Sequence, residues 1–419
     1  MEEMKFWKIK QHMPAVVLED IPAAVAAAFD QVGDRAADLK GKTVGIAVGS
    51  RGISHMDTIV KEVVANVKRM GGIPTVFGAM GSHGNGNAEG QREMLASLGI
   101  TESTVGAAIQ CSAEALELGT TPHGAKVYGN PLAFSFDRVI LMNRIKPHTD
   151  FEDRTESGIL KLLAIGIGNP MGAQMVHAKA LSIGYGDAIR DAAHMLLEKI
   201  PVAFAIAITE NWKHETSRIV PFLPEILEEE EAALLAKVKE ETVRLPMDDL
   251  DVLLVQEAGK NISGTCVDTK VVGRICITGQ KEPEKPKIRI VTVLDFTEES
   301  HGNAMGLGVV DLITRRAFDK IQIDATALTG TTSLCLHQAK IPCVARNGKE
   351  AVEVALRAAC VTEPSTCRMA YIKNTNALEE LAVSEAVYEE LKDRPGIEVI
   401  SGPFTLHFDE NDALLPVLE

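Results

Sequence analysis

Apolar and polar positions along the first half of the chain predict strands that are each followed by a helix. TVGIAVG at 43–49 is short, apolar and β-branched, which predicts a strand. The next segment, HMDTIVKEVVANVKRMGG at 55–72, repeats apolar residues at spacings of three and four until two glycines stop it, which predicts a helix. IPTVFGAM at 73–80 and AEGQREMLASLG at 88–99 repeat the strand and the helix.

The same alternation continues to about residue 210. DRVILMN at 137–143 is apolar without interruption, which predicts a strand covered on both faces, and it is followed by a predicted helix at 186–200 and a strand at 202–209. Strands that alternate with helices form a largely parallel sheet, and ligands bind outside the carboxyl ends of its strands. The loops SRGIS at 50–54 and GSHGNGN at 81–87 are therefore expected to face one crevice.

A second block of strands and helices begins beyond Pro246. A long amphipathic helix at 222–245 precedes it, and the EEEE run of that helix is interpreted as a solvated face with no role in a site. A chain of 419 residues exceeds the roughly 250–300 residues of a single core. The predicted fold class is α/β, with two α/β domains and an active-site crevice between them. Residues 1–245 form the cofactor-binding domain and 246–419 the domain that closes over the site, and the pattern leaves open whether the last residues return to the first domain.

The charge of the chain limits the classes of partner it can bind, and its cysteine pattern indicates the state of its thiols. Acidic residues outnumber basic ones by 58 to 43, a net charge of -15, which disfavours nucleic acid and anionic membranes as partners. No apolar run reaches the roughly 20 residues of a membrane helix, and the N-terminus lacks a signal-peptide pattern, so a cytoplasmic protein is expected. The seven cysteines are odd in number and lack a CxxC spacing, so most are expected to be buried thiols.

The first candidate ligand-binding and catalytic residues lie in the glycine-rich segment GSHGNGNAEG at 81–90. Its glycines let a backbone approach a ligand closely, and it ends at a helix start, where N–H groups favour phosphate or carboxylate. Ser82 and Gly84 are thus candidate cofactor contacts, and His83 can exchange protons near neutral pH. The alternative is an ordinary turn with an exposed histidine.

The stretch 143–178 contains the remaining candidates of the first domain. His148 follows a strand end, and Lys146 beside it can hold a carboxylate. Lys161 interrupts the apolar run SGILKLLAIG, where a desolvated amine becomes nucleophilic. His177 can ligate a metal, although no second histidine accompanies it at a ligand spacing. The alternatives are a solvated basic edge, a lysine that reaches solvent and a structural histidine.

Two further basic residues lie near predicted strand ends. Arg51 follows the first strand, where its planar guanidinium can grip a carboxylate or a phosphate. Lys260 precedes the polar loop at 261–274, which can close over the crevice from the second domain or serve as a plain connector.

The ordered set Arg51, His83, His148, Lys161 and His177, with the phrases GSHGNGNAEGQRE, RIKPHTDF and EAGKNISGT, resembles the nickel-pincer lactate racemase family. The resemblance implies a racemase or epimerase that transfers a hydride between C2 of a 2-hydroxy acid and a nickel-pincer nucleotide. That cofactor is a pyridinium-3-thioamide-5-thiocarboxylic acid mononucleotide with nickel.

The resemblance also implies a role for each residue. Lys161 is the covalent anchor of the nucleotide, His177 the protein ligand to nickel, and His83 and His148 the alternating acid and base. Arg51 helps to hold substrate or cofactor, and Lys260 lies near where the family has a substrate-binding lysine. From their positions in the sequence, Ser82 and Gly84 are further candidates for cofactor binding and Lys146 for substrate binding. Implied partners are a small anionic substrate and, transiently, the cofactor-synthesising enzymes.

One departure bears on the substrate. Gly84 stands where lactate racemase has a basic residue, so a larger or more acidic 2-hydroxy acid, or a sugar acid epimerised at C2, is as well supported as lactate. Two other functions remain open. One is a metal-dependent hydrolase or lyase that uses the same histidines without a tethered cofactor, and the other is a non-catalytic binder of a nucleotide or metabolite.

Overall fold

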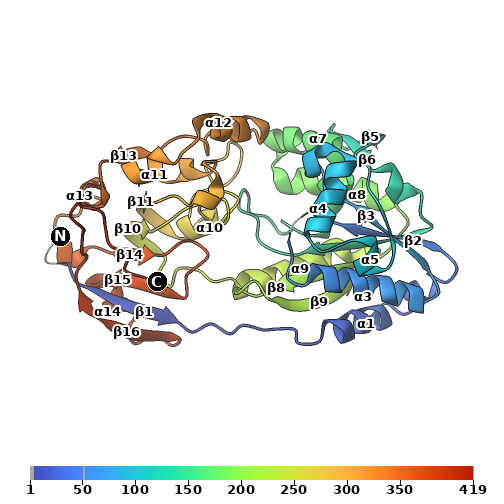
Figure 1. The fold of residues 1–419 in the computed structure, drawn as a ribbon, viewed down its shortest axis with the longest axis horizontal. Helices are drawn as coiled ribbons and strands as arrows, with labels where there is room; N and C mark the ends of the chain where they lie inside the picture. The colour runs from blue at the N-terminus through green and yellow to red at the C-terminus, as the bar shows by residue number, and fades with distance from the viewer. Residues whose placement is uncertain (1–3, 51, 419) are drawn as a thin grey trace. The chain divides into compact units, whose positions relative to one another are not determined.

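The computed structural model describes residues 4–50 and 52–418. The chain forms two compact units, one from Ala15–Thr242 and one from Met1–Pro14 together with Val243–Glu419. Each unit has its own sheet (Figure 1).

The unit of residues 15–242 is built on a six-stranded sheet in the order β4-β3-β2-β7-β8-β9. Neighbouring strands are parallel from β4 to β8, and β9 pairs antiparallel with β8 at the edge. The strands are β2 (Thr43–Val48), β3 (Ile73–Gly78), β4 (Ala108–Gln110), β7 (Arg138–Arg144), β8 (Val202–Glu210) and β9 (Thr216–Phe222).

Both faces of this sheet are covered. Ile46 and Val48 pack in one apolar cluster with residues of the helices on that side, whereas Ala47 between them packs in a cluster on the opposite side. This alternation explains why β2 and β7 are apolar at nearly every position. The helices are α1 (Ile21–Gln31), α2 (Asp34–Ala37), α3 (Met56–Arg69), α4 (Ala88–Ser97), α5 (Glu102–Val105), α6 (Ile159–Lys161), α7 (Asn169–Ile183), α8 (Tyr185–Lys199) and α9 (Leu227–Glu241).

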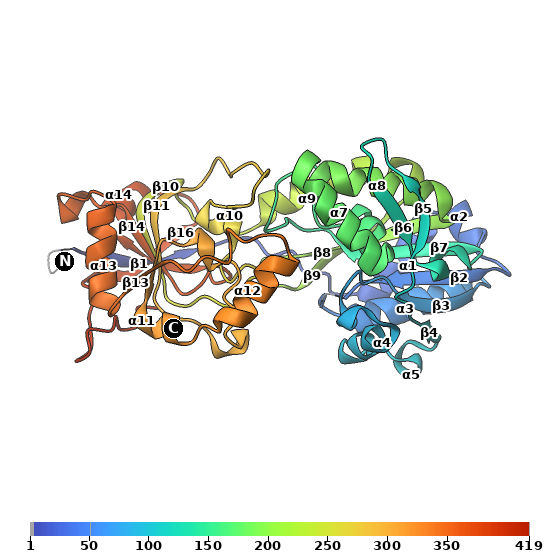
Figure 2. The same cartoon turned by 90° about the horizontal axis from the view of Figure 1, so that it is seen from above.

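The stretch with Lys161 and His177 forms a bent helical segment. A π-helical turn, Leu162–Ile167, continues α6, and α7 begins two residues later and lies beside α8 (Figures 1 and 2). Gly168 is required at the bend because a Cβ there would lie 2.3 Å from the Ala164 carbonyl oxygen. The hairpin of β5 (Leu116–Thr120) and β6 (Lys126–Gly129) contacts α7.

The other unit has an eight-stranded sheet in the order β13-β12-β11-β10-β14-β15-β1-β16. Pairing is parallel from β13 to β14 and antiparallel from β14 to β16. Its strands are β1 (Phe6–Gln11), β10 (Asp249–Val255), β11 (Lys287–Val293), β12 (Leu312–Thr314), β13 (Cys343–Ala345), β14 (Met369–Ile372), β15 (Glu380–Ser384) and β16 (Ile397–Phe404). Its helices are α10 (Thr269–Val272), α11 (Arg315–Asp319), α12 (Ile323–Thr332), α13 (Gly348–Ala358) and α14 (Glu385–Leu391).

The N-terminal strand departs from the predicted domain division. β1 pairs with β15 and β16, and its Phe6 and Ile9 are fully buried in the second unit. Residues 1–14 therefore belong to the unit that was predicted to begin at 246, and residues 243–419 all remain in that unit.

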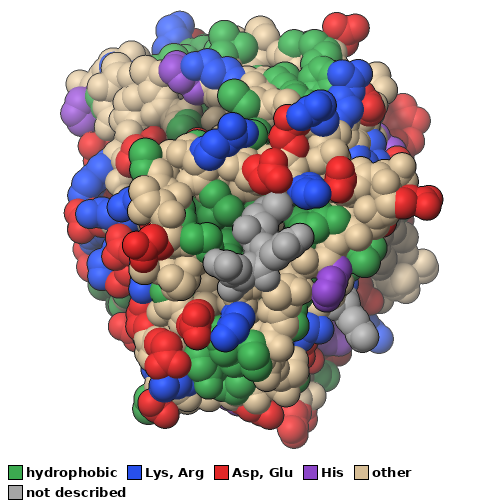
Figure 3. Space-filling view, turned by 90° about the vertical axis from the view of Figure 1, so that its left-hand side faces the viewer, with side chains coloured by type: hydrophobic (Ala, Val, Ile, Leu, Met, Phe, Trp, Pro, Cys, Tyr) green, Lys and Arg blue, Asp and Glu red, His purple; other side chains and the backbone are tan. Residues whose placement is uncertain are grey.

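Acidic and basic side chains are interspersed with apolar ones on the face shown in Figure 3.

The predicted α/β class, with a largely parallel sheet in the first domain, is confirmed. The cysteine prediction was only partly right, because Cys266, Cys335 and Cys367 are buried whereas Cys343 and Cys360 are exposed. Among the described residues, no single helix has the length and apolarity to cross a membrane; the pair Ile159–Ile167 and Asn169–Ile183 passes that test jointly but is bent by 115°.

Candidate functional site

The loops that follow β2 and β3 meet at one edge of the sheet, as parallel strands require. The Ser50 hydroxyl is hydrogen-bonded to Nδ1 of His83, and the N–H of Gly81 donates to the Gly166 carbonyl oxygen at 3.0 Å. The loop at 81–87, here called the His83 loop, therefore contacts both the end of β2 and the π-helical turn after Lys161. Ser82 and His83 are exposed to solvent. Arg51, the other candidate in these loops, lies outside the described residues.

Glycines in the His83 loop serve close backbone packing. A Cβ on Gly84 would lie 2.6 Å from the backbone nitrogen of Gln91, and one on Gly90 would lie 2.1 Å from the Gly84 carbonyl oxygen. The Asn87 side chain caps the start of α4 by accepting the N–H of Gly90 at 2.9 Å. This one N–H is satisfied within the chain, and binding of a phosphate or carboxylate at this loop and helix start stays a prediction.

Residues 146–157 form a closed loop, here called the His148 loop. Lys146 and Ser157 close it through two backbone hydrogen bonds of 3.0 and 3.2 Å. The fully buried Glu156 carboxylate inside the loop accepts the N–H of His148 at 2.5 Å and that of Asp153 at 3.2 Å. The carboxylate also forms an ion pair with Lys239 of α9, whose Nζ lies 2.5 Å from Oε1. The loop is thus built around one internal carboxylate.

The backbone of this loop also determines which tautomer the neutral His148 ring adopts. The Asp150 N–H donates to Nδ1 of the ring at 3.0 Å, so Nδ1 is an acceptor. In the neutral imidazole the proton then lies on Nε2, which can donate to a ligand. His83 is less constrained, because the Ser50 hydroxyl can either donate to Nδ1 or accept from it.

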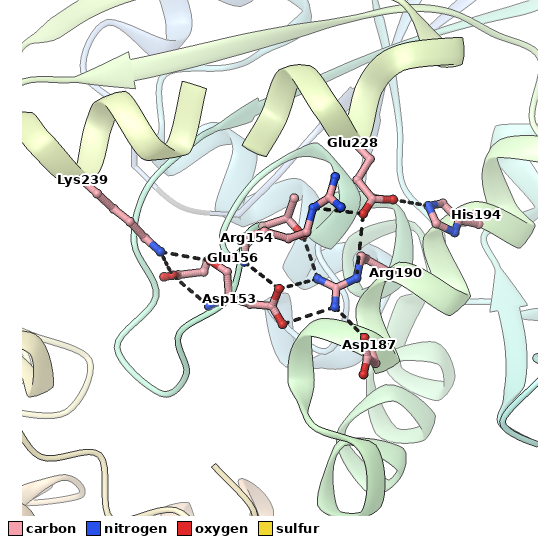
Figure 4. A network of polar contacts seen from close by, with 9 residues as sticks. Asp153, Arg154, Glu156, Asp187, Arg190, His194, Glu228 and Lys239 are labelled. Carbon is pink, nitrogen blue, oxygen red and sulfur yellow. Dashed lines mark hydrogen bonds and ion pairs between the residues drawn. The ribbon is translucent and has the colours of Figure 1, made fainter. Parts of the chain in front are cut away.

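A network of ion pairs fastens the His148 loop to α8 and α9 (Figure 4). Arg190 of α8 binds Asp153 and Asp187, each at 2.5 Å. Glu228 of α9 lies 3.9 Å from Arg190 and also contacts Arg154 and His194, at 3.5 and 2.7 Å. A network with a mostly buried central guanidinium holds geometry better than isolated surface pairs, each worth about 0–1 kcal/mol.

The acidic run of α9 therefore faces inward in part, and the interpretation of a solvated face was wrong for Glu231. Its carboxylate is fully buried and its Oε2 accepts the N–H groups of Ile159 and Leu160 at 2.7 and 3.1 Å. Those are the first two residues of α6, the helix that carries Lys161. Gly158 makes room for the carboxylate, since a Cβ there would lie 2.2 Å from Oε1. Burial raises the pKa of Glu231 to about 7.

Lys161 and His177 are close enough to interact electrostatically. Burial, and after it the positive charge of Lys161, lower the pKa of His177 to about 4. The imidazole is therefore neutral near pH 7, which is the form that binds metals. Its Nδ1 lies 3.3 Å from the hydroxyl of Tyr185.

A row of four aromatic rings joins His177 to His148. The rings of His177 and Tyr185 meet edge to face at 5.6 Å, and Tyr185 stacks on Phe151 at 5.3 Å. Phe151 lies 4.7 Å from the ring of His148. This ring row brings two predicted site residues, which are 29 positions apart in the sequence, into one contiguous structure.

Other basic residues are placed differently. Arg144, the last residue of β7, is paired with Glu210, which also accepts the N–H of Ser54 at 2.7 Å, so its charge is already matched. The side chain of Lys146 is exposed. Lys260 belongs to the other unit, where its ammonium donates to the Gly264 carbonyl oxygen, and a place beside the histidines stays a prediction. Among the described residues, no three His, Cys, Asp or Glu side chains are grouped as ligands for one metal ion.

Sequence reasoning missed the residues that support the site, namely Phe151, Glu156, Tyr185 and Glu231. One signal was present for Glu231, because it shares a helical face with the buried Leu227, Leu235 and Val238. An acidic residue at that spacing within an apolar face indicates a buried carboxylate.

The fold is shared with solved structures. The structure of the lactate racemase apoprotein from Thermoanaerobacterium thermosaccharolyticum superposes with a TM-score of 0.58 at 11% sequence identity, over 88% of this chain and 94% of that chain. A crystal structure of a protein from Thermotoga maritima gives a TM-score of 0.52 at 13% identity, over 86% of this chain and 99% of that chain. No protein-family model and no curated protein matches the sequence. Likeness at these identities establishes the α/β fold of lactate racemase for this chain.

Proposed function

We propose that this protein is an isomerase that racemises or epimerises a 2-hydroxy acid with a nickel-pincer nucleotide attached to Lys161. The observation that carries the proposal is the closeness of Lys161 to the partly buried His177, whose pKa is lowered by burial and, after it, by the charge of the amine. The likeness to the lactate racemase apoprotein over 88% of the chain supports the same assignment at the level of the fold.

The residues present fit such a group. His177 is a neutral imidazole and would hold the nickel, whose other ligands would be the sulfur atoms of the nucleotide. Lys161 is partly buried among apolar neighbours and would hold the nucleotide through its amine. When bound, the group would supply a hydride acceptor.

The two other histidines would move the proton of the 2-hydroxyl. His148 would give its Nε2 proton to the substrate oxygen from the doubly protonated ring, which leaves a neutral ring with the proton on Nδ1 and requires the hydrogen bond from the Asp150 N–H to open. His83 would take the hydroxyl proton on Nε2 of its neutral ring while its Nδ1–H donates to the Ser50 hydroxyl. In the reverse direction the two roles exchange. Arg51, Lys146 and Lys260 are the proposed partners of the substrate carboxylate.

Intact mass tests the tether. The protein is produced beside cofactor-building enzymes, its proposed transient partners, and analysed for nickel. An added mass that disappears in Lys161→Ala and persists in Lys179→Ala, a control on the neighbouring α7, is expected. Unmodified, nickel-free protein that still isomerises a hydroxy acid would refute the proposal.

Exchange of deuterium at C2, measured over a panel of 2-hydroxy and sugar acids, tests the acid and base. Loss of exchange is expected in His83→Ala and in His148→Ala, while His55→Ala, in the loop before α3, keeps it. Unchanged exchange in either of the first two variants rejects the role of that histidine. The panel also identifies the substrate class.

A further inference from the structure

Tyr185 stands where the helix of His177 meets the loop of His148. α7 ends at Ile183, the following Gly184 has a φ of 86°, and Tyr185 is the first residue of α8. A Cβ on the following residue, Gly186, would lie 1.8 Å from the Asp153 carboxylate, so only glycine lets the His148 loop pack against this turn. The sequence Gly184–Gly186 is therefore the joint between two histidine-bearing segments.

The buried ring of Tyr185 contacts both of these segments. On one side it meets the imidazole of His177 at an interplanar angle of 79°, and on the other it lies nearly parallel to Phe151, at 20°. Phe151 in turn packs on the ring of His148 at 4.7 Å. Aromatic pairs in edge-to-face and offset-stacked arrangements attract each other beyond the effect of the area they bury. A displacement of the tyrosine ring would be passed to both histidines.

The hydroxyl of Tyr185 lies against the ring of His177. It lies 3.3 Å from Nδ1, and a phenol can accept a hydrogen bond there as well as donate one. If Nδ1–H donates to the tyrosine oxygen, Nε2 carries a lone pair and points away from the tyrosine. A histidine that ligates a metal through one nitrogen usually donates from the other in this way.

We propose that Tyr185 is a positioning residue for both histidines: its hydroxyl keeps the proton of His177 on Nδ1, and its ring, through Phe151, holds His148 in place. The meaning of the Nε2 lone pair rests on the proposed function, whereas the tautomer and the ring packing are properties of the cofactor-free chain. The proposal is therefore tested without the cofactor.

The experiment compares two variants that separate the hydroxyl from the ring. Tyr185→Phe removes the hydroxyl and keeps the ring, and Tyr185→Leu removes both. The nitrogen-15 shifts of the histidine rings in cofactor-free protein report which nitrogen is protonated. Tyr128→Phe is the matched control, because this tyrosine lies in the same unit and its hydroxyl binds Glu117 at 3.0 Å.

Wild-type His177 is expected to be a single Nδ1–H tautomer that becomes a mixture in Tyr185→Phe, with the shifts of His148 unchanged. In Tyr185→Leu the shifts of His148 move as well. An Nε2–H tautomer of His177 in the wild type, or identical His177 shifts in wild type and Tyr185→Phe, overturns the proposal even if Tyr185→Leu fails to fold. The intact-mass experiment on Lys161 separates this outcome from failure of the proposed function, since the tautomer is independent of the tether.

Discussion

Replacing Glu231 by glutamine should change how stability depends on pH. The carboxylate is fully buried, its Oε2 accepts two backbone N–H groups, and its Oε1 has no hydrogen-bond partner among the described residues. Glutamine keeps an acceptor for Ile159 and Leu160 but cannot ionise. Its amide group, placed where Oε1 now lies, would cost about 1–3 kcal/mol at any pH because it would be unsatisfied.

The pH-dependent part of the change in the free energy of unfolding follows from the pKa of Glu231, which is about 7 in the folded chain against 4.5 for the ordinary group. The folded state holds the proton more tightly, so ionisation costs nothing below pH 4.5, and stability is lost as the pH rises from 4.5 through 7. The full loss is about 3 kcal/mol, of which about 2.5 kcal/mol accrues between pH 5 and pH 8. Relative to the wild type, Glu231→Gln should therefore gain about 2.5 kcal/mol over that interval.

Urea unfolding at pH 5 and pH 8 measures this difference. The chain has two tryptophans, Trp7 and Trp212, and a Trp7→Phe background leaves Trp212 to report the unit of residues 15–242. The exposed neighbour Glu229 supplies the control, since Glu229→Gln should follow the wild type at both pH values. Parallel pH dependence of the wild type and Glu231→Gln would refute a raised pKa for this carboxyl.

Three further substitutions test the supports of the site. Gly186→Ala should lower the free energy of unfolding by about 1–3 kcal/mol, because its Cβ displaces Asp153; an unchanged urea midpoint would contradict that contact. Glu156→Gln should speed amide hydrogen exchange at His148 roughly tenfold, because the N–H loses a charged acceptor, whereas the exposed Glu152→Gln should not. Gly84→Ala should destabilise by about 1–3 kcal/mol, because φ is 64° and a Cβ meets backbone atoms; thermal unfolding at the wild-type temperature would exclude this.

Local sequence patterns were sufficient for most elements of the fold. The predicted strands at 43–49, 73–80 and 137–143 are β2, β3 and β7, and the predicted helix at 186–200 is α8. A period of two or of 3.6 is set by backbone geometry within one element, so it can be read without knowing the partners. The adjacency of Ser50 and His83 also followed, because parallel strands place their ends at one edge.

The pairing of β1 could not be predicted from local sequence patterns. Its partner strands begin at Glu380 and Ile397, more than 360 residues away, and no short-range spacing encodes a pairing over that separation. Only the assembled sheet decides that the first residues of the chain complete the second unit.

The sequence by itself supplied the candidates for chemistry, because His83, His148, Lys161 and His177 are recognisable from residue type and from their place among predicted elements. The tertiary structure decided how they are supported. Burial of Glu156 and Glu231 and the row of rings through Tyr185 each depend on groups from separate elements. A carboxylate on a helix has the same local sequence whether it meets water or the start of another helix, and only packing removes the water that would otherwise solvate it.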